Sequence, residues 1–450
     1  MNIPKSLLHL NLKHCTKQEI VEYFINAWNL ENLLLKSIVD KNSFYQNPDD
    51  LRNPLIFYLG HSPAFYINKL ILSEIIKKGI NPKFEQMFGT GVDPQTPAEL
   101  KDAIAHIEWP SVDEVWQFRE QSYQLILDVI QKTSFILPIN WEQPFWALMM
   151  GIEHQYVHFE TSSVLIRQLP IEALKRPEDW NYASFSTTYP PNEMVLVSGA
   201  KVGFGKDINS ASYGWDNEYG ISKVIVDSFL LSKFMISNGE YKKFVDNGGY
   251  ENPTYWDAES WQWKLNYKVK YPKFWLVDEE GNYLYRAMFD ILTLPLNWPV
   301  EVNYYEAKAF CKFKGNRSRL MTEAEWHLIS QKTKEQNITN LENNDLNLNL
   351  KIFSPHPVDS LEKSCHPLNI YDLLGNIWEW LEDDFYAFDG FKTHALYADY
   401  SLPFFDGKHK MLKGGSWATH GNSSSTDYRN WFRPNFFQHA GFRIVQDIGS

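Results

Sequence analysis

Residues 151–167 place the narrowest limits on what this chain can fold into. The stretch contains no Gly or Pro after its first residue, and its apolar residues recur at helical spacing. His154 and His158 are four residues apart, so a helix here would carry both imidazoles on one face, close enough to share a metal ion. A zinc peptidase helix has Glu directly after the first His, whereas this chain has Gln155. The pattern favours a metal site without peptidase chemistry; the alternative is two half-exposed histidines on an amphipathic helix.

The chain changes character after Pro170, which predicts an α+β protein. Four long helical stretches precede this point, at residues 16–46, 55–79, 111–132 and 144–168. With a loop at 84–99, they fit an up-down four-helix bundle over residues 1–175. Pro63 should disturb the second stretch or begin a new helix there. The proline-bearing residues 176–192 are typical of a linker.

Residues 193–450 predict a second domain of a different kind. Short apolar runs broken by Gly, Asn and Asp indicate strands, at 194–197 and 224–226 among others. Helices are expected at 303–313 and 322–332, and the polar residues 333–350 predict an exposed, mobile insertion. Aromatic residues make up 16% of the chain, which favours a loop-rich domain whose core is built from large rings.

Charge and cysteine usage exclude several classes of protein. The net charge is −12 and no long block of Lys and Arg is present, so we expect no nucleic-acid partner. Cys15, Cys311 and Cys365 are an odd number without a CxxC spacing, which argues for a reducing compartment and against a cysteine-rich zinc site. No signal peptide and no apolar run of about 18 residues is present, so we expect a soluble cytoplasmic protein without a membrane partner.

A third metal ligand is needed beside the two helical histidines. His61 is the best candidate, because apolar residues flank it and Pro63 could aim it inward from a facing helix. The alternative is a core histidine satisfied by a backbone carbonyl. Imidazole ligands suit Fe, Zn, Cu or Ni, so the residues do not choose the metal. Tyr397 and Tyr400 could act as acids toward a metal-bound species.

Longer motifs carry a family resemblance. RLMTEAEW (319–326), GNIWEW (375–380), GGSW (414–417) and AGFR (440–443) resemble the sulfatase-modifying-factor, or formylglycine-generating-enzyme-like, domain, which has a C-type-lectin-like fold. NPLIFYLGH (53–61), MGIEH (150–154) and HFETSSVLIRQLP (158–170) resemble the DinB-type bundle of the iron-dependent sulfoxide synthases. Within that family, ETSSVLIRQLP and NPKFE (81–85) resemble the ovothiol-pathway 5-histidylcysteine sulfoxide synthases more than the ergothioneine-pathway members.

The resemblance implies an active site and a reaction. A non-haem Fe(II) would be bound by His61, His154 and His158, with O2 as the oxidant. L-cysteine would bind through its thiolate and be joined to a ring carbon of L-histidine, giving a sulfoxide on the route to ovothiol.

The resemblance also implies roles in the second domain. Tyr397 matches the active-site tyrosine of the family, with Tyr400 as a second candidate. Asn430 and Trp431 match positions that hold the imidazole-bearing substrate. The partner of the substrate carboxylate is a hypothesis only, with two candidates, Arg433 and Arg119.

The chain departs from the family pattern in ways that bear on its substrates. Ergothioneine-type members have Asp where this chain has Phe432, and Gln where it has Val157. Both changes favour cysteine over γ-glutamylcysteine. Ovothiol-type members often continue into a methyltransferase domain, which this sequence lacks after Ser450, so a separate methyltransferase is expected to act on the product.

Three other functions remain open from the sequence. The first is a sister enzyme, an ergothioneine- or selenoneine-type synthase, acting on Nα-trimethylhistidine with cysteine, γ-glutamylcysteine or a selenium donor. The second is a formylglycine-generating oxidase, which needs a cysteine pair; Cys311 and Cys365 lie away from the C-terminal motifs. The third is a non-catalytic, lectin-like binding module on a metal-free bundle.

Overall fold

The computed structural model describes residues 7–89, 91, 93–315, 317–335, 346–361 and 368–448, without the side chains of 332–335. It divides into two compact units. The helical unit comprises Met1–Trp180 together with Ile208–Tyr213 and His394–Leu396, and the second unit comprises Asn181–Asp207, Gly214–Thr393 and Tyr397–Ser450. Two short segments from the range predicted for the second domain therefore pack with the helices.

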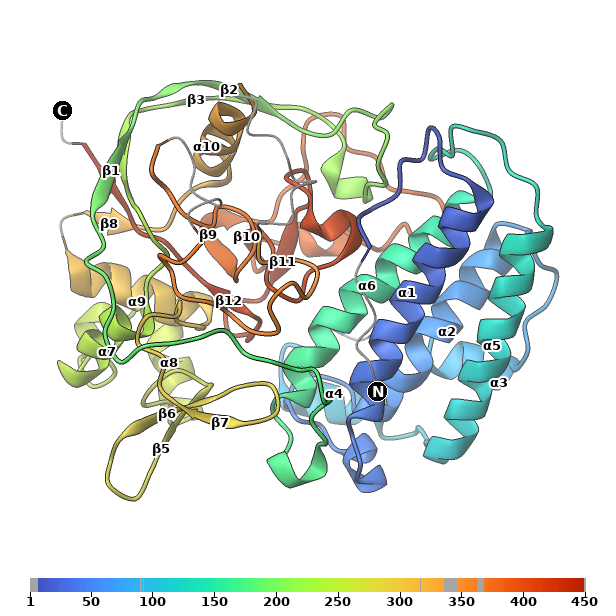
Figure 1. Ribbon diagram of the computed structural model, residues 1–450, viewed down its shortest axis with the longest axis horizontal. Coiled ribbons are helices and arrows are strands. Elements are labelled where there is room, and N and C mark those ends of the chain that lie inside the picture. The colour runs from blue at the N-terminus through green and yellow to red at the C-terminus, as the bar shows by residue number, and fades with distance from the viewer. Residues whose placement is uncertain are drawn as a thin grey trace. The chain divides into compact units, whose positions relative to one another are not determined.

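The helical unit is a bundle of four long helices, as predicted (Figure 1). They are α1 (Lys17–Lys36), α2 (Leu55–Leu72), α5 (Val112–Lys132) and α6 (Trp146–Ile166). α1 packs mainly against α5 and α6, and so does α2. The capping boxes that begin α1 at Thr16 and α5 at Ser111 fix where these helices start.

Two expectations for the bundle were wrong. The predicted loop at 84–99 contains most of α3 (Pro82–Met87) and most of the first turn of α4 (Pro97–Ile104), because Asn81 and Thr96 cap helices that open on Pro. Pro63 does not break α2. It lacks the N–H that would bond the Leu59 carbonyl, and Arg119 Nη1 donates to that carbonyl instead, at 3.2 Å.

In its described residues, the second unit is built from short strands in four small sheets. The first has the order β1-β4-β13-β8 and the second the order β11-β10-β9-β12, beside the hairpin β2-β3 and the meander β5-β6-β7. The strands are β1 (Met194–Val197), β2 (Ala200–Phe204), β3 (Ser222–Val226), β4 (Phe229–Ser232), β5 (Trp275–Val277), β6 (Tyr283–Arg286), β7 (Ile291–Thr293), β8 (Ser318–Arg319), β9 (Trp378–Asp384), β10 (Lys410–Lys413), β11 (Asn430–Phe432), β12 (Ala440–Gly441) and β13 (Val445–Asp447). Large buried rings, including Trp326, Trp378 and Trp380, fill the core.

The described residues of this unit also form four α-helices, of which α9 and α10 contact the strands and confirm sequence predictions. They are α7 (Asn238–Asp246), α8 (Ala258–Asn266), α9 (Tyr304–Lys314) and α10 (Glu323–Glu335). Of the predicted insertion at 333–350, residues 336–345 lie outside the described residues. Asn347, Leu348 and Leu350 are buried, so the expectation of exposure was wrong for that end.

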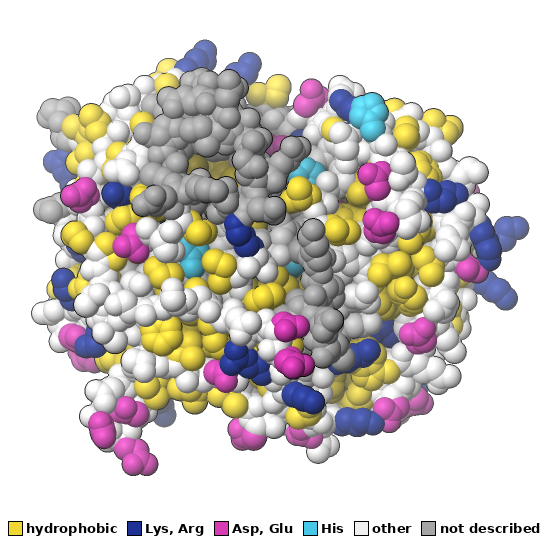
Figure 2. Space-filling view, viewed as in Figure 1, with side chains coloured by type: hydrophobic (Ala, Val, Ile, Leu, Met, Phe, Trp, Pro, Cys, Tyr) yellow, Lys and Arg dark blue, Asp and Glu magenta, His cyan; other side chains and the backbone are white. Residues whose placement is uncertain are grey.

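Two general properties of the described residues bear on partners. None of their helices combines the length and the apolar character needed to cross a bilayer. On the face shown in Figure 2, acidic and basic side chains are interspersed.

Candidate metal centre

Three histidines converge inside the helical unit. His61 of α2 and His154 and His158 of α6 each offer a ligand atom, and these atoms lie within 4.8 Å of one another. A metal bonds imidazole nitrogens at about 2.1 Å, which places them roughly 3–4 Å apart, so small side-chain shifts suffice to close the triad on one ion. Among the residues that the structure describes, this is the one His, Cys, Asp and Glu group that converges in this way.

The carbonyl of Phe88 sets the orientation of His61. His61 Nδ1 lies 2.6 Å from the Phe88 oxygen, and because a carbonyl cannot donate, Nδ1 carries the proton. Nε2 is then the unprotonated nitrogen available to a metal. The bond to a backbone carbonyl is therefore compatible with metal binding by His61, since a metal-bound imidazole usually donates its other N–H in this way.

Burial keeps the triad in the form that binds metals. Burial lowers the pKa of His61, and it lowers the pKa of His154 and His158 well below the usual value, with neighbouring imidazoles adding to both shifts. The three rings are neutral at neutral pH, so a metal need not displace protons. His158 Nδ1 is buried and has no hydrogen-bond partner among the described residues, as expected of a nitrogen whose partner is a metal or a second-layer group.

Aromatic rings hold the triad from the sides. The ring of Phe65 stacks on His154, with centroids 3.5 Å apart and planes 4° apart, and Phe57 stacks on His61 at 4.7 Å. Phe65 lies one helical turn after His61 and so reaches the histidine of the facing helix. These apolar walls exclude water from one side of the site.

Residue 155 points away from the triad into a buried polar network. Gln155 Nε2 donates to Glu31 at 2.7 Å, and Tyr66 donates to the Gln155 amide oxygen at 3.0 Å. Glu31 also accepts from Ser62 and pairs with Arg119 at 2.5 Å. Arg119 is 1% exposed and its guanidinium bonds Asn32, the Leu59 carbonyl and Glu31 inside the bundle, so its predicted role with a substrate carboxylate stays a prediction.

We expect Gly60→Ala to weaken metal binding. A Cβ on Gly60 would lie 2.5 Å from a ring carbon of Phe88, so Phe88 must move, and its carbonyl holds His61. Loss of such an outer partner typically costs about 10- to 100-fold in metal affinity. Titration of the apoprotein with Fe(II) under anaerobic conditions measures this. Gly203→Ala is the control, because its Cβ would make only ordinary contacts at 3.8 Å; equal affinity in both variants would contradict the role of Phe88.

The predicted residues of the second unit gather around one aromatic cluster. The rings of Tyr397 and Tyr400 are 5.2 Å apart, and Tyr400 meets Trp431 edge to face at 5.2 Å. Trp431 stacks on Phe385 at 4.2 Å. Burial raises the pKa of Tyr397, with Asp399 and Asp216 adding to the shift, so its phenol keeps its proton at neutral pH.

The remaining predicted residues lie on or beside β11. Asn430 pairs with Leu412 of β10, and its side-chain oxygen accepts from the Trp431 N–H at 3.0 Å. Asn430 and Arg433 are both half-buried, and Arg433 directly follows the strand. The two units are not placed relative to one another, so these residues and the triad are separate observations.

A turn that sequence reasoning did not single out supports the tyrosine segment. The turn η3 (Asp216–Glu218) follows Trp215, whose ring stacks on Tyr400 at 4.1 Å. Asp216 and Asn217 both bond the Ser401 hydroxyl, which donates to Asp216 and accepts from the Asn217 amide. Burial raises the pKa of Asp216 to about 6.

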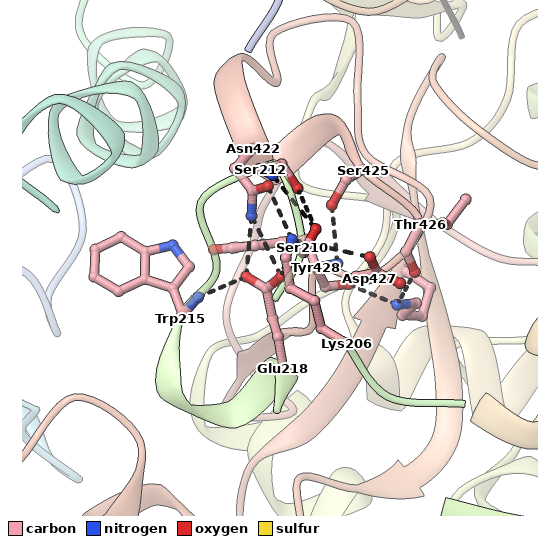
Figure 3. Close-up of polar contacts among 11 residues, drawn as sticks. Lys206, Ser210, Ser212, Trp215, Glu218, Asn422, Ser425, Thr426, Asp427 and Tyr428 are labelled. Atoms are coloured by element: carbon pink, nitrogen blue, oxygen red, sulfur yellow. Dashed lines mark hydrogen bonds and ion pairs between the residues drawn. The ribbon is translucent and has the colours of Figure 1, made fainter. Parts of the chain in front are cut away.

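Buried charged side chains hold η3 in place (Figure 3). Lys206 Nζ lies 3.2 Å from both Glu218 and the Asn422 side-chain oxygen, and Glu218 accepts from the Trp215 N–H at 2.9 Å. The polar run Asp216-Asn217-Glu218 between the aromatic residues Trp215 and Tyr219 was the available sequence signal, because buried polar groups need partners.

Cys311, one of the two cysteines considered for an oxidase, is a structural residue. It is buried in α9, and burial raises the pKa of its thiol to about 12, so it is not a reactive thiolate. Cys365 lies outside the described residues.

Comparison with known proteins defines the family. The sulfatase-modifying factor enzyme 1-like domain matches residues 182–448, more than half of the chain, and the chain belongs to this family. The fold class is thus a helical bundle followed by a C-type-lectin-like domain, as predicted.

Relatives extend the similarity into the helical unit. The chain is 25% identical to the hercynine oxygenase of Mycolicibacterium thermoresistibile, over 96% of this chain and 95% of that protein. It is 25% identical to ergothioneine biosynthesis protein 1 of Schizosaccharomyces pombe, over 98% of this chain but 57% of the relative, so it spans little more than half of that fungal protein. It is 30% identical to the hercynine oxygenase of Mycobacterium tuberculosis, over 54% of this chain and 58% of the relative.

Proposed function

We propose that the chain is a non-haem Fe(II)- and O2-dependent sulfoxide synthase that joins a thiol to the imidazole of hercynine, which is Nα-trimethylhistidine. The observation that carries this proposal is the buried, neutral triad of His61, His154 and His158, in a chain similar over nearly its full length to a hercynine oxygenase. Cysteine is the proposed thiol donor, because Phe432 stands where an acidic residue would bind a larger, amine-bearing donor.

The donor set fits Fe(II), and the reaction balances with O2. Three imidazoles would hold the metal and leave positions for substrates. Bound iron would supply the redox chemistry that couples O2 to oxidation of the thiol. The thiol S–H and one imidazole C–H are lost, a C–S bond forms, one oxygen atom becomes the sulfoxide and the other leaves as water.

The proposed roles in the second unit follow from its aromatic cluster. Tyr397 retains its phenolic proton and is the proposed proton donor, with Tyr400 as the second candidate. Asn430 and Trp431 are proposed to hold the imidazole-bearing substrate: an indole face suits a flat heteroaromatic ring, and an amide can pair with its nitrogens. Arg433 remains the proposed partner of the substrate carboxylate.

Histidine is the second candidate substrate. The motif at residues 160–170 favours it, through its resemblance to the ovothiol-pathway enzymes. The relatives named above are hercynine and ergothioneine proteins instead, so they favour the trimethylated substrate. They lend no support to the ovothiol assignment, nor to the separate methyltransferase that it required.

A competition experiment separates the two substrates. Fe(II)-loaded protein receives cysteine, O2 and equal amounts of histidine and Nα-trimethylhistidine, and mass spectrometry distinguishes the two sulfoxides by the trimethyl group. We expect the trimethylated product to predominate. A predominance of 5-histidylcysteine sulfoxide would restore the ovothiol-type assignment.

A further inference from the structure

A short segment from far along the sequence belongs to the helical unit. His394, Ala395 and Leu396 pack with the bundle, although the chain on either side belongs to the second unit. Tyr397, the proposed proton donor, is the next residue. The contacts that hold this segment therefore determine where the backbone leading into Tyr397 is fixed.

Lys69 holds the segment to α2. Its Nζ donates to the Leu396 carbonyl at 2.6 Å. Lys69 lies two helical turns after His61, and its ammonium is 4.9 Å from the ring of Phe65, the ring that stacks on His154. The same helix thus carries a proposed metal ligand and the residue that fixes the Leu396 carbonyl.

His394 holds the segment to the start of α6. The Leu396 N–H donates to His394 Nδ1 at 3.0 Å, so Nδ1 is unprotonated and Nε2 carries the proton. Nε2 lies 3.0 Å from the Trp141 carbonyl, which accepts that proton's hydrogen bond. The His394 ring lies 4.4 Å from Trp141 and stacks at 6.4 Å on Trp146, the first residue of α6.

Both backbone polar groups of Leu396 are therefore bonded: Lys69 of α2 donates to the carbonyl, and the N–H donates to His394, whose ring bonds the Trp141 carbonyl five residues before α6. We infer that Lys69 and His394 are positioning residues, which fix Leu396 to α2 and to the segment that leads into α6, and so set the starting point of the segment that carries Tyr397. The inference rests on the proposed role of Tyr397 as proton donor. Each acts by holding the backbone.

A positioning role predicts a loss in kcat with little change in KM. Displacement of a reacting group by about 1 Å can cost on the order of 100-fold in rate. Lys69→Met removes the donor but keeps the chain length, and His394→Phe keeps the ring but removes both nitrogens. We expect kcat to fall at least about 10-fold in each, with iron content unchanged and a larger share of cysteine oxidised without C–S bond formation. Lys69→Arg, which can still donate to the carbonyl, should recover most of the loss.

Hydrogen exchange tests, without relying on activity, the anchor that Lys69 and His394 form for Leu396. We expect the peptide spanning residues 393–400 to exchange faster in Lys69→Met and His394→Phe than in the wild-type chain. Lys78→Met, an exposed lysine after α2, is the matched control and should change neither exchange nor kcat.

Three results would overturn the inference: unchanged exchange in both variants, faster exchange with wild-type kcat, or loss of iron in Lys69→Met. If the wild-type chain forms no C–S product, the proposed function fails. Hydrogen exchange then still decides whether the anchor exists, because unchanged exchange would overturn it on its own.

Discussion

The His154→Ala protein is expected to lose stoichiometric iron and, with it, nearly all sulfoxide-synthase activity. His154 is 4% exposed and its ligand atom lies within 4.8 Å of those of His61 and His158. Removal leaves two imidazoles, and the loss should exceed the 10- to 100-fold that outer-shell changes cost. Metal analysis of anaerobically reconstituted protein measures the effect.

Thermal unfolding gives a second measurement that needs no turnover. A ligand at about 100 times its Kd stabilises the native state by about 2.7 kcal/mol, so Fe(II) should raise the Tm of the wild-type chain and not that of His154→Ala. His106→Ala, which removes an exposed histidine of the same unit, is the control and should behave as wild type. Equal iron content in wild type and His154→Ala would leave the non-catalytic, metal-free reading as the better one.

Arg429→Met is expected to produce the largest loss of stability in the second unit. Arg429 immediately precedes Asn430, and its guanidinium makes a two-pronged bond to Glu323, at 2.7 and 3.0 Å, with both side chains fully buried. It also donates to the carbonyls of Asn217 and Tyr386, and so joins η3 to β11. Removing one member of a buried pair leaves the other charge uncompensated, at a cost of about 3–5 kcal/mol.

Urea unfolding followed by tryptophan fluorescence measures this loss. Lys132→Met is the control, because its pair with Asp128 is exposed and should contribute at most about 0.5 kcal/mol. Adding Glu323→Gln to Arg429→Met should recover part of the loss, since residue 323 then no longer carries a buried charge without its Arg429 partner. A loss under about 1 kcal/mol in Arg429→Met would contradict the view that this pair holds β11 in place.

The same pair predicts a pH dependence with a definite sign. Burial alone would raise the pKa of Glu323, but the charge and hydrogen bonds of Arg429 outweigh burial and lower it. A carboxyl with a lowered native pKa contributes stability above its unfolded value, and that contribution is lost as the pH falls through the native value. The difference in stability between wild type and the double variant should therefore shrink on acidification below about pH 4.5.

The residues that the sequence predicted are those whose signals are local. The spacing of His154 and His158 needs only a helix, and the capping boxes at Thr16 and Ser111 mark helix starts within four residues. Prediction of the whole triad also required a ligand from another helix. The apolar residues that flank His61 identified it as the candidate.

The residues that the sequence missed depend on contacts between distant parts of the chain. Lys69 and Leu396 are 327 positions apart, and no periodicity relates them. Arg119 has no local sign that it satisfies a carbonyl left open by Pro63. Phe88 fell in a predicted loop, yet its carbonyl orients His61. Such pairings follow from packing, which pattern and propensity do not encode.

The most direct test is a single-turnover experiment on the reconstituted protein. The chain is loaded with Fe(II) under anaerobic conditions, mixed with cysteine and Nα-trimethylhistidine or histidine, and exposed to O2 while oxygen uptake and product mass are followed. We predict a sulfoxide that contains a new C–S bond to one of these two imidazole substrates. One O2 should be consumed per molecule of product. Oxygen uptake that yields only oxidised cysteine, or no uptake by protein with iron bound at the triad, would contradict the proposed function.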